Sequence, residues 1–493
     1  MVTRVSRRLL LGGALGSLAG LAWAGAPDVS LRPRRRPTDF AVRSAPEAEA
    51  LVREARLGGQ VSYAVVDVSS GRVVESRRAD AGQPPASVTK AVTALYALDV
   101  LGASYRFQTR LLAAGTVRDG VLDGDLVLAG GGDPTLDTDA LADMAARLKK
   151  SGVREVRGKL RVWTGALPFE RVIDRTQPEH VGYNPSISGL NLNYNRVRFE
   201  WKRAGGDYAV TLDARSAKYR PEVRVSRMSV ARRRMPVYTY SDKGDHDAWT
   251  VARAALGNGG ARWLPVRKPG AYAAEVFATF ARSHGVVLEI GAPLGAAPTG
   301  RVLVTHKSAP LSAILRGMLK YSNNLTAELV GMTATARRRG RPMPMRVSAR
   351  EMSRWARARL GMRDTRLVDH SGLGEASRLS AGAMASALAQ VHGKAGLQPL
   401  LKTFSMSAGN GPGGPAEVAA KTGTLYFVSS LAGYMTAASG RDFAFAIFTA
   451  DTDRRSRYDP SSGQRPEGAR GWNSRAKRLQ QRLLARWERV HGG

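Results

Sequence analysis

The stretch Pro84-Pro85-Ala86-Ser87-Val88-Thr89-Lys90 places a serine and a lysine three positions apart, where a proline-rich loop meets an apolar-periodic run. That run has helical spacing through Val88, Ala91, Val92, Leu95 and Leu98. Side chains at i and i+3 of a helix lie about 5–6 Å apart on one face, so Ser87 and Lys90 can act as nucleophile and base. Ser474 and Lys477 repeat the same spacing, so the spacing alone does not identify a site.

Segments on both sides of this stretch predict a mixed α+β chain. Alternating residues predict one hairpin from 61–68 and 72–76 and a second from 105–113 and 122–129. Residues 155–270 alternate through much of their length and predict a β-rich module. Further helices are expected at 137–151, 272–283 and 311–320, and strands at 419–427, 431–437 and 442–450.

A basic amphipathic helix is expected at residues 473–490. Such a helix can pack on the neighbouring sheet or lie on a membrane surface, and packing on the sheet is the commoner outcome.

Two further short motifs occupy informative places. Ser322-Asn323-Asn324 follows the helix at 311–320, and Lys421-Thr422-Gly423-Thr424 opens the first of the last three strands. Gly423 can leave that strand edge open to a ligand. In order along the chain, Ser-x-x-Lys, Ser-x-Asn and Lys-Thr-Gly resemble the motifs of the penicillin-recognising serine enzymes.

The resemblance extends to four longer stretches, at 122–136, 321–328, 369–373 and 421–434. They are similar to the D-Ala-D-Ala carboxypeptidase/DD-endopeptidase family, the class C low-molecular-mass penicillin-binding proteins. The family implies a three-layer α/β/α, β-lactamase-like serine-peptidase domain with a five-stranded antiparallel sheet, interrupted by a β-rich insertion. We expect the catalytic domain at 41–136 and 290–493 and the insertion at 137–289. More than 200 residues separate Ser87 from Ser322, too many for a simple β-lactamase.

The resemblance also implies the catalytic roles. Ser87 attacks the carbonyl of the penultimate D-Ala, and Lys90, neutral when buried beside the Lys421 ammonium, takes the hydroxyl proton. Ser322 relays a proton to the leaving D-Ala nitrogen, and Asn324 hydrogen-bonds the substrate amide.

Binding roles follow from the third motif of the same family. Lys421 and Thr422 hold the terminal carboxylate, and Gly423 keeps the strand edge open. The backbone N–H groups of Ser87 and Thr424 form an oxyanion hole. β-Lactams are expected to acylate Ser87 and to leave slowly, because no deacylating glutamate is evident. The expected partners are peptidoglycan peptides and β-lactam inhibitors, with no cofactor and no metal.

Three positions depart from the family pattern. Asp369-His370-Ser371 stands where Asp-Gly-Ser is usual. Glu375 stands where many relatives carry an arginine that contacts the diaminopimelate side chain, and Asn193 replaces an aspartate of the insertion. The last two changes bear on side-chain specificity and leave the acyl-transfer chemistry intact.

Residues 1–24 have the layout of a secretory signal peptide, with Arg4, Arg7 and Arg8 before an apolar run that ends in Ala22-Trp23-Ala24. The Arg7-Arg8 pair resembles a twin-arginine signal, and an ordinary Sec signal is the alternative. Residues 25–40 predict an unstructured basic leader. No later segment approaches the roughly 20 apolar residues that span a bilayer, so we expect a periplasmic protein without a transmembrane anchor.

Composition narrows the chemistry further. The chain has no cysteine, which excludes disulfides and a thiol nucleophile, and its seven histidines never fall at zinc-ligand spacing. The net charge of +34 is spread along the chain, with small clusters at 32–36, 232–234, 337–341 and the last thirty residues. No nucleic-acid module accompanies it, so we expect no nucleic-acid partner. The charge fits anionic polymers of the cell envelope or substrates with carboxylates, and equally a general arginine bias that keeps surfaces solvated.

Two other patterns are interpreted as structural. Residues 409–414 satisfy Gly-x-Gly-x-x-Gly without a βαβ setting and predict a loop. His370 adjoins Ser371, but neighbouring residues rarely face each other, so a turn is expected there. Two alternative functions stay open from the sequence: a serine β-lactamase, and an inactive basic protein that binds the envelope.

Overall fold

The computed structural model describes residues 45–404, 417–458 and 465–493. The expected signal peptide at 1–24, the basic leader at 25–40 and the glycine-rich loop at 409–414 lie outside these residues. None of the described helices is long and apolar enough to cross a lipid bilayer.

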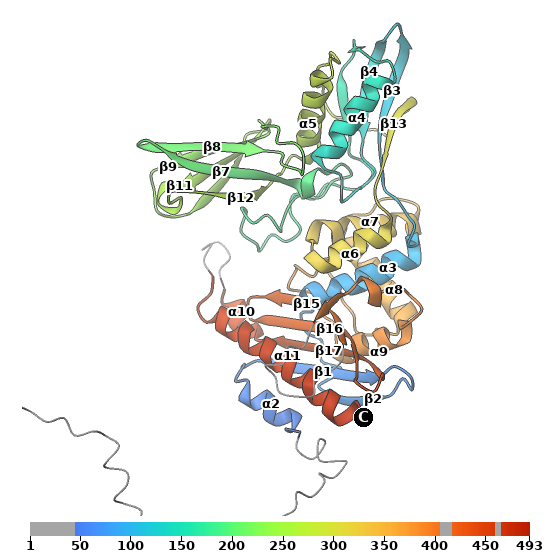
Figure 1. The fold of residues 1–493 in the computed structure, drawn as a ribbon, viewed down its shortest axis with the longest axis vertical. Coiled ribbons are helices and arrows are strands. Elements are labelled where there is room, and N and C mark those ends of the chain that lie inside the picture. Colours follow the sequence, from blue (N-terminus) through green and yellow to red (C-terminus); the bar gives the residue numbers. More distant parts are fainter. Residues whose placement is uncertain (1–44, 405–416, 459–464) are drawn as a thin grey trace, which may run out of the picture. The chain divides into compact units, whose positions relative to one another are not determined.

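An antiparallel sheet joins the first predicted hairpin to the strands near the C-terminus (Figure 1). Its order is β14 (Lys402–Phe404), β15 (Glu417–Leu425), β16 (Val428–Thr436), β17 (Asp442–Ala450), β1 (Gln60–Asp67) and β2 (Val73–Arg77). β1 pairs with β17 along its whole length, from Gln60 opposite Ala450 to Asp67 opposite Phe443. The sheet has six strands instead of the expected five, because the three-residue β14 pairs with the outer edge of β15.

Alternation along β17 gives the sheet two buried faces, as strand geometry requires. Phe443, Phe445 and Ile447 point into one hydrophobic cluster, and Ala444, Ala446 and Phe448 point into another. A sheet buried on both faces needs a helical layer on each side. The expected three-layer arrangement is therefore present.

The first face is covered by α2 (Ala48–Glu54) and α11 (Ala469–His491), shown in blue and red in Figure 1. Residues 472, 476, 479, 483 and 487 recur at helical spacing on α11 and are buried against the sheet. The ring of Trp487, for example, lies 5.7 Å from that of Tyr63 between centroids. The basic helix expected at 473–490 thus packs on the sheet.

The second face is covered by five helices: α3 (Thr89–Leu101), α6 (Leu311–Tyr321), α7 (Asn324–Arg339), α8 (Met345–Leu360) and α9 (Ala381–Val391). The predicted helix after Ser87 is α3, and it ends at Gly102, whose φ of 83° suits a glycine. Ser87 itself lies in the short 3₁₀ helix Ala86–Val88 that leads into α3.

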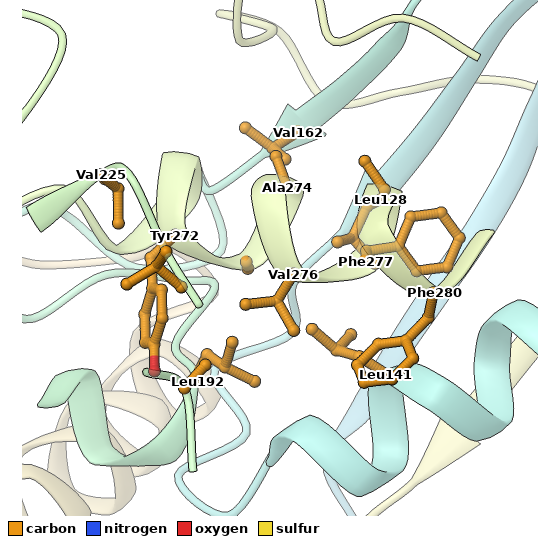
Figure 2. Close-up of a cluster of buried hydrophobic side chains, with 14 of the residues drawn as sticks. Leu128, Leu141, Val162, Leu192, Val225, Tyr272, Ala274, Val276, Phe277 and Phe280 are labelled. Atoms are coloured by element: carbon orange, nitrogen blue, oxygen red, sulfur yellow. The ribbon is translucent and has the colours of Figure 1, made fainter. Parts of the chain in front are cut away.

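Between α3 and α6 the chain forms a second sheet with its own core (Figure 2). The sheet contains β3 (Gln108–Arg118), β4 (Val121–Ala129), β5 (Glu155–Val156), β6 (Leu160–Trp163) and β13 (Arg301–Lys307), and it packs with α4 (Thr138–Lys150) and α5 (Pro269–Ser283). In Figure 2 the α5 side chains of Tyr272, Val276 and Phe277 lie in one cluster with Leu128 and Leu141. This cluster draws residues from 111 to 304 and so runs across the boundaries expected at 136 and 290. The division into domains stays a prediction.

Of the β-rich module expected within 155–270, β5 and β6 belong to the second sheet, and the later strands form two three-stranded sheets. One has the order β12 (Gly259–Pro265), β7 (Arg196–Ala204), β8 (Asp207–Asp213), and the other β10 (Tyr238–Asp242), β11 (Asp247–Ala252), β9 (Ser226–Ala231). Phe199 of β7 and Trp249 of β11 are both buried in the cluster of the second sheet. The module therefore shares a core with α4 and α5.

Candidate active site

Ser87 and Lys90 lie at the start of α3, as the helical spacing predicts. The Nζ atom of Lys90 lies 3.0 Å from the Oγ atom of Ser87. Ala86, just before the serine, has a φ of 45°, a left-handed conformation that is strained for a residue with a Cβ. This turn leaves Ser87 half-buried, while Lys90 is completely buried below it.

Lys90 has two more hydrogen-bond acceptors. Its Nζ donates to Oδ1 of Asn324 and to the carbonyl oxygen of Ser371, both at 2.7 Å. Burial lowers the pKa of Lys90 to about 7, and the positive charge of Lys421 contributes to the shift. An amine with this pKa is partly neutral at neutral pH and can accept the proton of a nearby hydroxyl.

Ser322 and Lys421 form a second hydroxyl–amine pair. The Nζ of Lys421 donates to Oγ of Ser322 at 3.0 Å and to the carbonyl oxygen of Thr422 at 2.7 Å. Ser322 ends α6 in the left-handed conformation, with a φ of 57°. Burial and the charge of Lys402 lower the pKa of Lys421 to about 8. The structure thus brings together residues from all three predicted motifs.

Gly423 lets strand β15 pass directly beside the Ser87 turn. A Cβ atom on Gly423 would lie 2.7 Å from the carbonyl oxygen of Pro85 and 3.0 Å from the backbone nitrogen of Ser87. Carbon atoms do not approach backbone so closely, so only glycine fits here. Thr422 and Thr424, on either side, are exposed.

A cavity of about 850 Å³ opens in front of Ser87, and we call it the Ser87 cavity. Ser322, Asn324 and Thr424 line it together with Ser87. Its other lining residues are Gln177, Tyr183, Gly372, Leu373, Leu425, Tyr426, Arg455, Tyr458, Arg465, Ala469, Arg470, Asn473, Ser474 and Lys477. None of these described residues is an aspartate or a glutamate.

One wall of the Ser87 cavity is basic. Arg455 follows β17, Arg465 and Arg470 come shortly before and at the start of α11, and Lys477 lies about two turns further along this helix. Ser474, the serine of the second Ser-x-x-Lys match, is on the same wall, where its hydroxyl donates to the carbonyl oxygen of Arg470 at 3.0 Å. Anionic groups of a ligand would be attracted to this wall.

A loop from the β-rich side also reaches the Ser87 cavity, which the sequence did not predict. Gln177 and Tyr183 line the cavity, and the carbonyl oxygen of Tyr183 accepts a hydrogen bond from Nδ2 of Asn324 at 2.9 Å. Because Asn324 also accepts from Lys90, the loop is joined to Lys90 through one amide side chain.

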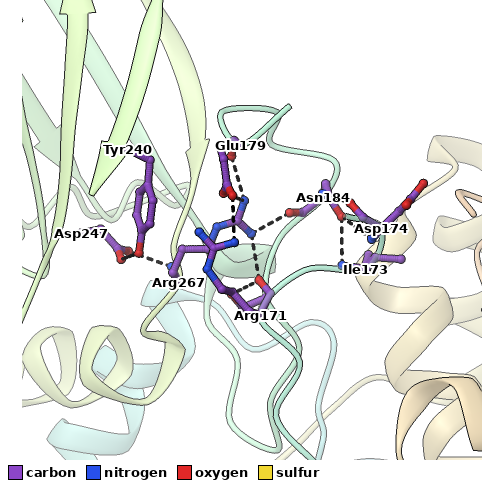
Figure 3. A network of polar contacts seen from close by, with 9 residues as sticks. Arg171, Ile173, Asp174, Glu179, Asn184, Tyr240, Asp247 and Arg267 are labelled. Carbon is purple, nitrogen blue, oxygen red and sulfur yellow. Dashed lines mark hydrogen bonds and ion pairs between the residues drawn. The ribbon is translucent and has the colours of Figure 1, made fainter. Parts of the chain in front are cut away.

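A buried arginine holds this loop in place (Figure 3). Arg267 donates through Nη1 to the carbonyl oxygen of Asn184 and through Nη2 to that of Glu179, both at 2.8 Å. Its backbone N–H donates to Oδ2 of Asp247 at 2.8 Å. The guanidinium therefore ties the segment on both sides of Tyr183 to the β-rich module.

Two buried carboxyl groups, to which the sequence assigned no role, support the other side of Lys90. Glu328 accepts the N–H groups of His370 and Ser371, at 3.0 and 2.8 Å, and Asp369 accepts that of Gly372 at 2.6 Å. Burial and the neighbouring charge of Asp369 raise the pKa of Glu328 to about 8. These bonds shape the turn that offers the Ser371 carbonyl to Lys90. Glu328 lies within the stretch 321–328 that carries the family resemblance.

His370 does not pair with Ser371. Its Nε2 lies 2.8 Å from Oγ of Ser348, and burial lowers its pKa to about 3, so the ring is neutral. The ring occupies space left by Gly331 of α7, where a Cβ would lie 2.2 Å from Nδ1. The histidine of Asp369-His370-Ser371 is thus accommodated behind the site, in agreement with the structural interpretation.

Glu375 and Asn193, the other two residues that depart from the family pattern, lie in different surroundings. Glu375 is exposed and forms an ion pair with Arg455 of the basic wall at 3.1 Å. Asn193 is buried in the insertion, where Nδ2 donates to Oγ1 of Thr138 at 2.8 Å and to the hydroxyl of Tyr272 at 3.1 Å. It is not among the described residues that line the Ser87 cavity.

Comparisons with known proteins agree with this arrangement. The chain is 30% identical over 449 residues to a D-alanyl-D-alanine carboxypeptidase of Actinomadura sp. (strain R39), covering 81% of this chain and 80% of the relative. It is 25% identical over 433 residues to the D-alanyl-D-alanine carboxypeptidase DacB of Haemophilus influenzae, covering 82% and 89%. The crystal structure of penicillin binding protein 4 (dacB) from Haemophilus influenzae has a similar fold, with a TM-score of 0.74 at 22% identity over 89% of this chain and 99% of that one.

The model of the D-Ala-D-Ala carboxypeptidase 3 (S13) family matches residues 46–464, which include all three motifs. The match covers most of the chain and both hydroxyl–amine pairs. This protein therefore belongs to the D-Ala-D-Ala carboxypeptidase 3 (S13) family of serine-type hydrolases.

Proposed function

We propose that the protein is a serine D-Ala-D-Ala carboxypeptidase and endopeptidase that cleaves peptidoglycan stem peptides and cross-links through an acyl-Ser87 intermediate. The observation that carries this proposal is the 3.0 Å contact between Oγ of Ser87 and Nζ of Lys90, a buried amine whose pKa is about 7. A serine beside a base of this pKa is an activated nucleophile.

In the acylation step, Oγ of Ser87 attacks the carbonyl carbon of the penultimate D-Ala while Lys90 accepts the hydroxyl proton. The bond to the terminal D-Ala nitrogen then breaks, and Ser322 passes a proton to that nitrogen. The hydrogen bond from Lys421 to Ser322 supports this role, because a cation beside the hydroxyl makes its proton easier to give up. One N–H of the Asn324 Nδ2 group donates to the Tyr183 carbonyl, and the other would donate to the substrate amide.

The developing oxyanion is assigned to the backbone N–H groups of Ser87 and Thr424. The close approach of β15 at Gly423 supports this assignment, because it brings the strand beside the Ser87 turn. Each such donor is worth roughly 3–4 kcal/mol of transition-state stabilisation.

Carboxylates of the substrate are assigned to the basic groups around the cavity. Lys421 and Thr422 would hold the terminal carboxylate, next to the bond that breaks. The basic wall would favour a stem peptide with a further carboxylate in its side chain, where Arg455 is partly neutralised by Glu375. Side-chain preference should therefore depend on that ion pair.

Water, or the amine of another peptide, then resolves the acyl-enzyme. The described lining residues of the Ser87 cavity include no carboxylate to activate water against a β-lactam adduct. We therefore expect penicillin to acylate Ser87 and to be released slowly.

Residues 1–24 and 25–40 are proposed as a signal peptide and a basic leader that place the enzyme in the periplasm, with the twin-arginine route favoured over Sec. Fusion of residues 1–40 to a reporter tests the route. Export that persists after R7K/R8K substitution would assign it to Sec.

The proposed activity is tested by measuring D-alanine release from a soluble stem peptide that ends in D-Ala-D-Ala, and cleavage of a cross-linked peptide dimer. The wild type is expected to cleave, and Ser87→Ala is expected not to. Rapid hydrolysis of penicillin would instead favour a serine β-lactamase. If the wild type reacted neither with the peptides nor with penicillin, the result would favour an inactive protein that binds the envelope.

A further inference from the structure

A second cavity, of about 630 Å³, lies in the β-rich module and is lined mainly by arginines. It lies where the β7–β8 hairpin end, the turn after β9 and the 3₁₀ turn at 253–255 come together. Its lining residues are Arg203, Tyr208, Arg232, Arg233, Arg234, Arg253, Ala254, Gly257 and Asn258, and we call it the arginine pocket. None of these described residues also lines the Ser87 cavity.

Arg253 and Tyr208 pack together within the arginine pocket. The Arg253 guanidinium lies over the Tyr208 ring at 5.4 Å and forms an ion pair with Asp207 at 2.8 Å. The Tyr208 hydroxyl donates to the carbonyl oxygen of Gly257 at 2.7 Å. The charge of Arg253 is therefore compensated, and its position is fixed.

The other arginines of the pocket are not compensated. Arg233 donates to the carbonyl oxygen of Pro236 and to the hydroxyl of Thr250, both at 2.7 Å and both neutral acceptors. Arg203, Arg232 and Arg234 are exposed, and their side chains have no hydrogen-bond or ion-pair partner within the part of the chain that the structure describes. Four positive charges thus surround one hollow without an anion between them.

Arg215, in the same module, is by contrast paired, with Glu200 at 3.1 Å and Asp213 at 2.9 Å. Uncompensated like charges repel one another, and a bound anion would relieve that repulsion. Because four uncompensated arginines line one cavity, the arginine pocket has the electrostatic character of an anion site.

The chemistry of the side chains fits a chain of phosphates. Guanidinium groups bind phosphate oxygens through paired N–H donors, as they also bind carboxylates, and four of them can contact successive charges of a chain. The only aromatic residue among the described lining residues, Tyr208, is covered by Arg253, so no ring is free to stack on a nucleic-acid base.

We propose that the arginine pocket binds a linear polymer of phosphodiester-linked polyols in the cell envelope, and so holds the protein near its wall substrate. The binding site is separate from the Ser87 cavity, and this role goes beyond the proposed peptidase activity. Its envelope setting rests on the proposed export.

The test measures binding of the full chain to poly(glycerol phosphate) as a function of salt concentration. The variant R232S/R234S removes two uncompensated charges, and R337S/R341S removes two exposed arginines of the 337–341 cluster as the matched control. We expect R232S/R234S to weaken binding at least about tenfold and to make the slope of log K against log salt shallower by about two. The control should bind within about twofold of the wild type.

Three results would overturn the proposal. Equal weakening by both variants would mean that net charge alone drives binding. Equal affinity for polyglutamate of the same charge would remove the preference for phosphate, and tighter binding to a DNA oligonucleotide would point to nucleic acid. D-alanine release from a soluble peptide should be unchanged in R232S/R234S, so the binding result can fail without any effect on the proposed peptidase activity.

Discussion

The chain contains two Ser-x-x-Lys pairs, and both serines line the same cavity in very different surroundings. Ser87 and Lys90 begin a buried helix, and their side chains are 3.0 Å apart. Ser474 and Lys477 lie on the exposed side of α11, where the serine hydroxyl bonds to a carbonyl of its own helix. The same spacing thus places a serine beside a buried amine in one place and on a solvated helix surface in the other.

Burial and partners make the difference. Taking an ammonium out of water disfavours its charged form, and of the two lysines only Lys90 is buried. Lys90 also has fixed acceptors in Asn324 and the Ser371 carbonyl, so its position does not depend on the substrate. The Ser-x-x-Lys spacing brings the two side chains near each other, and burial within the fold lowers the pKa of the lysine.

The largest effect is expected at the serines themselves. Ser87→Ala should lower kcat for D-alanine release at least about 1000-fold, because no acyl-enzyme can form. Ser474→Ala should stay within about twofold of the wild type, since its hydroxyl only bonds to its own helix. A steady-state assay with the stem peptide compares kcat of the two variants. A similar loss of kcat in both would mean that the two Ser-x-x-Lys pairs do not differ in function.

The lysines should show the next largest difference. Lys90→Met removes the base and should lower kcat by about 100- to 10,000-fold, the usual contribution of a general base. Lys477→Met carries the same substitution on the basic wall, where we expect only a change in KM. Circular dichroism and thermal unfolding of both variants check that the loss at Lys90 is not a loss of fold. A properly folded Lys90→Met enzyme with near-normal kcat would show that Lys90 is not the base.

The pH dependence tests the coupling between the buried amines. Because the proposed mechanism uses Lys90 as the neutral amine, kcat/KM should rise with pH through an apparent pKa near 7. Lys421→Ala removes a neighbouring positive charge that favours the neutral form of Lys90, so the pKa of Lys90 should rise. The rising, acid limb of the kcat/KM profile should then move to higher pH. The same variant should lose about 10- to 100-fold in kcat/KM through lost carboxylate binding, worth about 1.4 kcal/mol per tenfold.

Lys477→Ala is the control for that profile and should leave the acid limb in place. If both lysine variants moved the limb equally, the pKa of Lys90 would depend on the general positive charge of the cavity instead of its contact neighbourhood.

The smallest effect is expected from Arg267, which holds the loop whose Tyr183 carbonyl bonds to Asn324. Arg267→Met removes donors from two backbone carbonyls beside Tyr183, and the looser loop should raise KM about three- to tenfold with kcat nearly unchanged. Arg267→Lys keeps a donor and should recover part of the loss. A fall in kcat without a change in KM would mean that the loop affects the chemical step and not substrate binding.

The sequence predicted the elements that carry local signals. The helix at Ser87, the turn at Ser322 and the strand at Lys421 were placed by periodicity and by the order of the motifs, and the structure brings these residues together. Gly423 was expected to leave a strand edge open to a ligand, and that role stays a prediction. In the structure a glycine is required there because the Pro85 carbonyl approaches so closely.

Contacts between distant segments could not be predicted in the same way. Tyr183 reaches Asn324 across more than 100 residues, through a loop without periodicity that depends on the buried Arg267. Strand β14 is only three residues long, too short for an alternating pattern, so the sixth strand was missed. Each of these features depends on packing between segments, for which a single sequence holds no local signal.

The most direct test of the central claim is to find the serine that penicillin acylates. After reaction with penicillin, trypsin releases Ser87 in the peptide 79–90 and Ser474 in the peptide 471–475, and mass spectrometry locates the adduct. We predict one penicilloyl group on the peptide 79–90, none on 471–475, and no adduct in Ser87→Ala. An adduct on 471–475, or one that persists in Ser87→Ala, would contradict the account.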